Sequence, residues 1–266
     1  MIAGDRAGKA HWDNTWQQAA VPVRPAEIDG LGRWNHVNRG VARFLRRWLT
    51  LGIANRCLVE FGCARSVWLP FFANQLGYSV SGIDYSELGC DLARKTLARA
   101  NVEGEVVLGD FFDPPGALVE HFDAAFSFGV AEHFDDTAGC IQAFARLLKD
   151  RGRIVTIIPN MTGVPGYLQK RLNRPVYDKH VPLDRAALLA AHQAAGLRVL
   201  DAGYLFSTNF GVLNLTGLPT GTAAWAAKRA FTAALARVSL IGWAVEPWLP
   251  PVQSFAGYVY CVAERA

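Results

Sequence analysis

The stretch from residue 57 to residue 84 constrains the fold of this chain more than any other. It opens with a short apolar run at 57–59 and continues through a tight turn that contains Gly62. An apolar, helix-like segment at 67–76 follows, and a second apolar run at 78–83 ends in an acid. This order predicts a strand, a turn, a helix and a second, parallel strand.

The turn and the acid that ends this stretch have the arrangement of a nucleotide-binding site. Gly62 lets the backbone approach a ligand closely, and the helix that follows offers unpaired N–H groups. Asp84 lies 22 positions after Gly62, about where an acid accepts hydrogen bonds from a ribose. Ala64 and Ser66 stand where a dinucleotide motif would carry further glycines, which argues against a nicotinamide cofactor. Taken alone, the turn fits a parallel sheet without any ligand equally well.

Five motifs in chain order resemble those of class I S-adenosylmethionine-dependent methyltransferases. They are similar to that family's acid-x-Gly turn, ribose acid, adenine-contacting turn, fourth-strand motif and turn into the fifth strand. In this sequence they occupy residues 58–63, 82–86, 109–112, 122–133 and 148–155. The resemblance covers about residues 56–206, and the departures at Ala64 and Ser66 bear on the shape of the methionine pocket.

The resemblance implies a set of cofactor-binding residues. It puts Glu60 near the methionine end of S-adenosylmethionine and Asp84 on the ribose hydroxyls. It also implies that Tyr85 and Phe111 sandwich the adenine, while Asp110 accepts a hydrogen bond from the exocyclic amine. The same resemblance brings in five further cofactor-binding positions, namely Gly62, Cys63, Phe112, Phe128 and Gly129. Phe111 and Phe112 also fit a plain core role.

The binding site for the methyl acceptor is predicted from fewer residues. An aliphatic hydroxyl needs a general base, whereas a neutral amine or a carboxylate needs little activation. The catalytic candidates are His133, after the fourth strand, and Tyr177 and His180 in a later insertion, although either histidine also fits a structural role in its loop. The candidates for substrate binding are Trp12, Trp16, Tyr167, Tyr177 and His180. Trp12 and Trp16 alternatively pin an N-terminal arm to the core.

Strands that alternate with helices predict one α/β domain, a Rossmann-like doubly wound sheet. The sequence contains seven strand-like runs, and the resemblance adds that the last strand is antiparallel. We expect an N-terminal helical arm at 1–55, a cofactor-binding core at 56–206, an insertion at 207–254 and the last strand at 255–266. One further helix is expected from the spacing of its inner stripe, which consists of Ile141, Phe144, Ala145 and Leu148.

Two insertions interrupt the alternation. The first, at 160–182, leaves the carboxyl end of a core strand, where open α/β sheets bind ligands. The second contains a helix-like run whose apolar stripe is interrupted by Lys228, Arg229 and Arg237, so it is no membrane span. Three roles are open for it: a cap on the substrate pocket, a homodimer face, or a peripheral membrane contact by residues 223–249.

The composition narrows the choice of function. A net charge of +4 without a long basic stripe, and a fourth-strand motif unlike that of amino-methylating DNA enzymes, argue against nucleic acid as a partner. Five cysteines without a C-x-x-C pair, and no signal-peptide core, indicate reduced thiols in a cytoplasmic protein, and no ligand spacing predicts a metal.

The expected function is therefore methyl transfer from S-adenosylmethionine to an oxygen or nitrogen atom of a small molecule, such as a metabolite, natural product or sugar. The alternatives are a nicotinamide-dependent oxidoreductase and a non-catalytic partner protein with a cofactor-binding fold. The intact acids at Glu60, Asp84 and Asp110 argue against the second.

Overall fold

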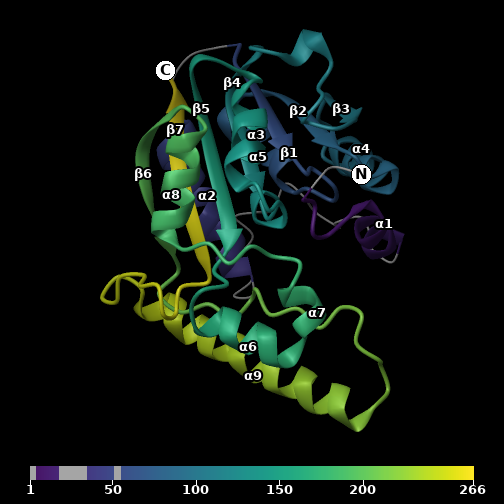
Figure 1. Ribbon diagram of the computed structural model, residues 1–266, viewed down its shortest axis with the longest axis vertical. Coiled ribbons are helices and arrows are strands. Elements are labelled where there is room, and N and C mark those ends of the chain that lie inside the picture. The colour runs from purple at the N-terminus through teal and green to yellow at the C-terminus, as the bar shows by residue number, and fades with distance from the viewer. Residues whose placement is uncertain (1–3, 18–34, 51–54) are drawn as a thin grey trace.

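A computed structural model describes residues 4–17, 35–50 and 55–266, and its centre is a seven-stranded sheet (Figure 1). The strand order is β3-β2-β1-β4-β5-β7-β6, and β7 runs antiparallel to both of its neighbours. This confirms the expected doubly wound sheet with an antiparallel last strand. The strands are β1 (Cys57–Phe61), β2 (Ser79–Asp84), β3 (Gly104–Leu108), β4 (Phe122–Phe128), β5 (Leu148–Pro159), β6 (Leu197–Leu205) and β7 (Tyr258–Arg265).

Helices cover both faces of the sheet. Because successive side chains of a strand point to opposite faces, the buried residues form two clusters, one on each face. On β4, Ala125 faces the cluster that includes Phe144 of α5, whereas Phe126 faces the cluster that includes Leu45 of α2 and Phe72 of α3. Both faces are thus apolar, as expected for buried strands. The helices that cover the two faces are α2 (His36–Leu49), α3 (Trp68–Leu76), α4 (Glu87–Arg99), α5 (Thr137–Ala145) and α8 (Arg185–Ala194).

The structure corrects the expected inner stripe of α5. The helix ends at Ala145, and Leu148 is the first residue of β5, where it pairs with Phe122. Arg151 has a φ of 60°, and the β4–β5 register shifts by several residues around it. An apolar residue at the i+7 position fits a helix or the start of a strand equally well, so periodicity alone could not place Leu148.

The first insertion forms α6 (Val164–Leu172) and α7 (Arg174–Tyr177), beyond the carboxyl end of β5 (Figure 1). The second contains α9 (Ala223–Val245), a helix of 23 residues that buries only Ser239 and Gly242. Lys228 Nζ donates a hydrogen bond to the carbonyl of Leu172, which ties α9 to the end of α6. Within the described residues, no helix is both long and apolar enough to cross a membrane.

The N-terminal arm contributes α1 (Lys9–Gln17), which lies beside α4. The expected boundary between arm and core, at 55–56, comes directly after residues 51–54, which lie outside the described residues.

Candidate active site

The carboxyl ends of β1 and β2 meet at the glycine turn. Gly62 follows β1 with a φ of 65°, and its N–H donates to the carbonyl of Ile83 at 2.9 Å. A Cβ atom built on Gly62 would lie 2.5 Å from Val130 Cγ2. Both the backbone conformation and the close approach of the Val130 loop therefore require glycine here.

Asp84 holds this turn together from the end of β2. Its carboxylate accepts hydrogen bonds from the backbone N–H of Ala64 at 3.1 Å and of Ser86 at 2.8 Å. The side chain is buried, and burial raises the pKa of Asp84 to about 6. A carboxylate in this place has acceptor positions left for ligand hydroxyls.

Glu60 pairs with one of the residues that depart from the family pattern. Ser66 Oγ donates to Glu60 Oε2 at 2.5 Å and accepts from the N–H of Trp68, the first residue of α3, at 2.8 Å. Burial raises the pKa of Glu60 to about 8, against the opposing effect of the Ser66 hydrogen bond. Serine at position 66 thus connects the buried acid to the helix.

A cavity enclosing about 690 Å³, open solvent included, lies over these strand ends. Among the expected cofactor residues, those that line it are Gly62, Asp84, Tyr85, Phe111, Phe128 and Gly129. Those outside the lining are Glu60, Cys63, Asp110 and Phe112. Asp110 Oδ1 instead accepts from the N–H of Phe112.

The N-terminal arm forms one wall of this cavity. Trp12 and Trp16 of α1 line it with their rings stacked 5.7 Å apart. Two arm acids that the sequence analysis did not single out anchor the arm to the core. Tyr85 Oη donates to Asp5 Oδ2, and Ser86 Oγ donates to Asp13 Oδ1 at 2.6 Å.

A second cavity opens beside the first. Four residues line both: Trp12, Phe128, Gly129 and His133. The remaining walls come from core elements and both insertions, and consist of Glu132, Pro159, Met161, Val176, His180, Val212, Asn214 and Tyr258. Val212 and Asn214 precede α9, so the second insertion borders this cavity through its first loop.

The two expected substrate tyrosines lie outside both linings. Tyr167 is 57% exposed, with the guanidinium of Arg171 over its ring. Tyr177 has the ammonium group of Lys170 over its ring. Of the residues named in the first insertion, His180 is the one that reaches the second cavity.

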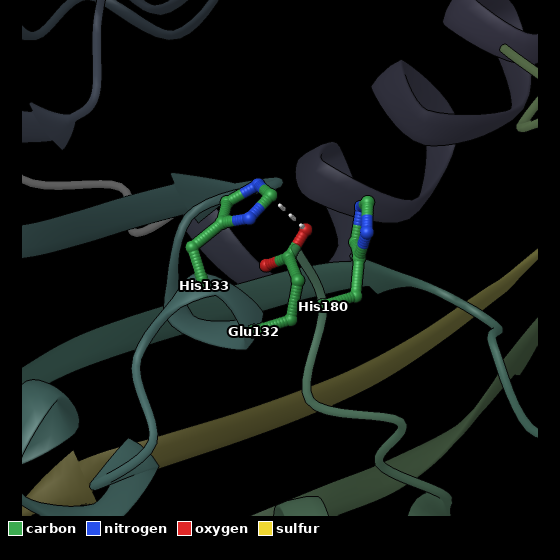
Figure 2. A group of neighbouring side chains, drawn as sticks. All are labelled: Glu132, His133 and His180. Carbon is green, nitrogen blue, oxygen red and sulfur yellow. Dashed lines mark ion pairs between the residues drawn. The ribbon is translucent and has the colours of Figure 1, made fainter. Parts of the chain in front are cut away.

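Glu132, His133 and His180 gather at the edge of this second cavity, and Figure 2 shows the Glu132 carboxylate between the two imidazole rings. Burial raises the pKa of Glu132 to about 8 and lowers the pKa of His133 to about 3, and burial also lowers the pKa of His180. At neutral pH both imidazoles are therefore uncharged. The Glu132–His133 contact of 3.8 Å is too long for a hydrogen bond, and between neutral groups it is no ion pair.

Sequence reasoning named both histidines but not Glu132. The signal available was its position beside His133 in the fourth-strand motif. Its side chain is 1% exposed, and neither carboxylate oxygen has a hydrogen-bond partner.

Comparison with known proteins gives this site its context. A family model described as a methyltransferase domain matches residues 33–202. A ubiquinone biosynthesis O-methyltransferase from Thiobacillus denitrificans is 28% identical over 153 residues, which are 54% of this chain and 66% of that protein, just under two thirds of its length.

Two solved structures share the fold. Geranyl diphosphate C-methyltransferase from Streptomyces coelicolor A3(2), in complex with Mg²⁺, geranyl diphosphate and S-adenosyl-L-homocysteine, has a TM-score of 0.64 at 18% identity, with 97% of each chain covered. The [4+2]-cyclase SpnF has a TM-score of 0.62 at 17% identity, with 98% of this chain and 96% of that chain covered. The chain therefore belongs to the methyltransferase domain family, as a class I S-adenosylmethionine-dependent methyltransferase.

Proposed function

We propose that this methyltransferase methylates a hydroxyl oxygen of a small, largely apolar acceptor that binds in the second cavity. One observation carries the proposal: the two cavities share a wall at Trp12, Phe128, Gly129 and His133, and proton-accepting side chains stand on the acceptor side of it. A methyl donor in the first cavity and an acceptor in the second would face each other across this wall. Such placement, with water excluded, supplies much of the acceleration in a displacement reaction.

The first cavity fits the cofactor in two respects. The Gly62 turn lines the cavity without a side chain, and Asp84 offers buried carboxylate oxygens at a strand end. When bound, S-adenosylmethionine supplies an electrophilic methyl group on a sulfonium sulfur. In our proposal Asp84 binds the ribose, while Tyr85 and Phe111 contact the adenine. The α1 tryptophans exclude water from the reacting atoms.

The side chains of the second cavity favour a hydroxyl acceptor. Its walls are apolar at Met161, Val176 and Val212, and its polar lining residues include Glu132, the two histidines and Asn214. A cavity made for a carboxylate or an amine would need no base there. Imidazoles of lowered pKa are weak bases, which favours an acidic hydroxyl such as a phenol, with a pKa of about 10, over an alkyl alcohol. The curated relative named above is also an O-methyltransferase.

The test is a matched acceptor panel. A phenol, an aniline and a benzoate, each with the same apolar substituent, are incubated with the enzyme and S-adenosylmethionine that carries a labelled methyl group. Mass spectrometry of the products should show labelled methyl on the phenol at least tenfold faster than on the other two. Preferential labelling of the aniline or the benzoate would contradict the proposal.

We further propose that the outward face of α9 contacts anionic membrane surfaces, which commits to one of the three roles left open for this insertion. Apolar side chains are exposed on the helix and just beyond it, namely Phe231, Val238, Ile241, Trp248 and Leu249. The charged residues of α9 are Lys228, Arg229 and Arg237, without an acid among them. Glu246 caps the C-terminus of this helix, and the helix itself carries only basic charges. An exposed apolar face on such a helix is complementary to anionic lipid headgroups.

A further inference from the structure

Three potential metal ligands from two distant segments of the chain converge beside the acceptor cavity. Glu132 and His133 belong to η3 (Ala131–His133), just after β4, whereas His180 lies in the loop after α7. One ligand atom from each lies within 4.8 Å of the other two (Figure 2). Because 47 positions separate the two histidines, no spacing rule on the sequence could detect the group.

Both imidazoles are held in a tautomer that leaves one ring nitrogen able to bind a metal. The Nδ1 atom of His133 lies 2.8 Å from the carbonyl oxygen of Lys179, and that of His180 lies 2.8 Å from the carbonyl oxygen of Val176. A carbonyl oxygen only accepts, so each Nδ1 carries the proton and each Nε2 keeps a free lone pair. Histidines that bind metals characteristically donate their other ring N–H in this way.

The carboxylate between them lacks a partner. Glu132 is 1% exposed, and both of its oxygens are buried without a hydrogen bond. Within the described residues, no lysine or arginine forms an ion pair with it, and Arg6, the nearby cation of the arm, donates to the carbonyl of His180 instead. A buried, unpaired acid is costly, and a bound cation is one way in which proteins offset that cost.

We propose that Glu132, His133 and His180 bind one divalent transition-metal ion, with Zn²⁺ as the representative ion. Two imidazole nitrogens and one carboxylate oxygen suit Zn²⁺ and its neighbours in the first transition row, whereas Mg²⁺ prefers oxygen ligands. At metal–ligand distances of about 2.1 Å, tetrahedral ligand atoms lie about 3.4 Å apart. Because the ligand atoms lie within 4.8 Å of one another, the three side chains need to close by at most about 1.4 Å.

The position of this site gives the metal a role that rests on the proposed function. His133 and His180 line the acceptor cavity, so an acceptor hydroxyl can occupy an open coordination position. In the metal-bound site the two imidazole nitrogens hold the ion instead of accepting the proton. Coordination lowers the pKa of the hydroxyl, which then loses its proton to solvent. The oxygen then forms a bond to the methyl carbon while the carbon–sulfur bond breaks, and that electron pair returns to the sulfur.

The test is calorimetric titration of the tag-free, metal-stripped protein with Zn²⁺ at pH 7. We expect one site per chain, with affinity at least tenfold weaker in Glu132→Gln and in His180→Ala. The matched control is His121→Ala, which removes an exposed histidine remote from the group and should leave binding unchanged. Equal Zn²⁺ affinity in all four proteins, or no stoichiometric binding to the wild type, would overturn the proposal.

A second readout separates loss of the site from loss of the fold. Zn²⁺ should raise the melting temperature of the wild-type protein but not that of Glu132→Gln, because only a ligand of the folded state stabilises it. Titration with S-adenosylhomocysteine, run in parallel, should give the same affinity for both. If that cofactor product binds but Zn²⁺ does not, the metal inference fails while the methyltransferase assignment stands. If the acceptor panel fails but Zn²⁺ binds, the proposed acceptor alone is wrong.

Discussion

His133 and His180 lie with their ring centroids 4.7 Å apart, and a backbone hydrogen bond joins the two segments that carry them. The N–H of Val181 donates to the carbonyl of Glu132 at 2.7 Å, which fixes the loop after α7 against η3. The N-terminal arm reaches the same place, because Arg6 donates from its backbone N–H to the carbonyl of His133 and from its guanidinium to that of His180. The acceptor side is thus assembled from three segments that are far apart in sequence.

We predict that Asp84→Ala weakens binding of S-adenosylmethionine and its demethylated product by roughly 1–3 kcal/mol, as expected for lost hydrogen bonds to a charged group. Calorimetry measures the affinity. The same carboxylate also holds the N–H groups of Ala64 and Ser86, so a thermal melt must show that the variant is folded. Wild-type affinity in the folded variant would remove Asp84 from the cofactor site.

A pH dependence of stability follows from Glu60. In the folded chain its pKa is about 8, against an ordinary value of 4.5, so between these pH values the folded state holds a proton that the unfolded state releases. The free energy of unfolding contributed by this group therefore falls as pH rises from about 4.5 to 8, by at most about 1.4 kcal/mol per pH unit.

Urea denaturation at pH 5, 6.5 and 8 tests this dependence. The stability of the wild type relative to Glu60→Gln should decline with pH, because glutamine has no proton to lose. Glu103→Gln, at an exposed position, is the control and should follow the wild type at every pH. Parallel curves for wild type and Glu60→Gln would contradict the prediction.

The cofactor half of the site could be predicted from the sequence because its residues follow consecutive strands. Gly62 and Asp84 are fixed by the βαβ order, and the carboxyl ends of parallel strands meet at one edge. The residues of the acceptor half could be predicted only in part. Asp5, Asp13 and Glu132 carry no periodic signal, and only the tertiary fold brings the arm and the first insertion to the same cavity.

The tyrosines of the first insertion show the same limit. A long insertion at a strand end indicates an acceptor region, but its helical register decides which side chains face inward. In α6 and α7 the buried side chains include Gln169 and Val176, while Tyr167 faces solvent.

Removal of residues 255–266 should unfold the protein rather than trim a tail. This segment contains β7, which lies between β5 and β6 and pairs with both along its length. Without it, two strands would each lose a neighbour and the fully buried side chains of Val259, Cys261 and Val262 would leave the core. Circular dichroism should show no cooperative melt. A truncated chain that melts like the wild type would refute the role given to this strand.

The α9 surface is expected to bind vesicles of mixed phosphatidylcholine and phosphatidylserine, and to bind pure phosphatidylcholine at least tenfold more weakly. Co-sedimentation measures this, and rising salt should weaken the binding. Trp248→Ser and Arg237→Glu should each reduce it. Leu108→Ser is the control, since Leu108 is 50% exposed on a different part of the molecule. Vesicle binding that survives both the Trp248→Ser and the Arg237→Glu change would exclude this surface as the membrane contact.

His180 and Tyr177, both in the first insertion, are expected to differ in their contribution to turnover. His180→Ala should lower turnover at least tenfold, because His180 lines the acceptor cavity, while the affinity for S-adenosylhomocysteine stays within twofold. Tyr177→Phe should leave both nearly unchanged, since its ring lies under Lys170 and outside the cavity lining. Turnover under saturating cofactor and calorimetry make the two measurements. Lost turnover in Tyr177→Phe, with His180→Ala fully active, would reverse the assignment and place the reacting hydroxyl against α7 instead of η3.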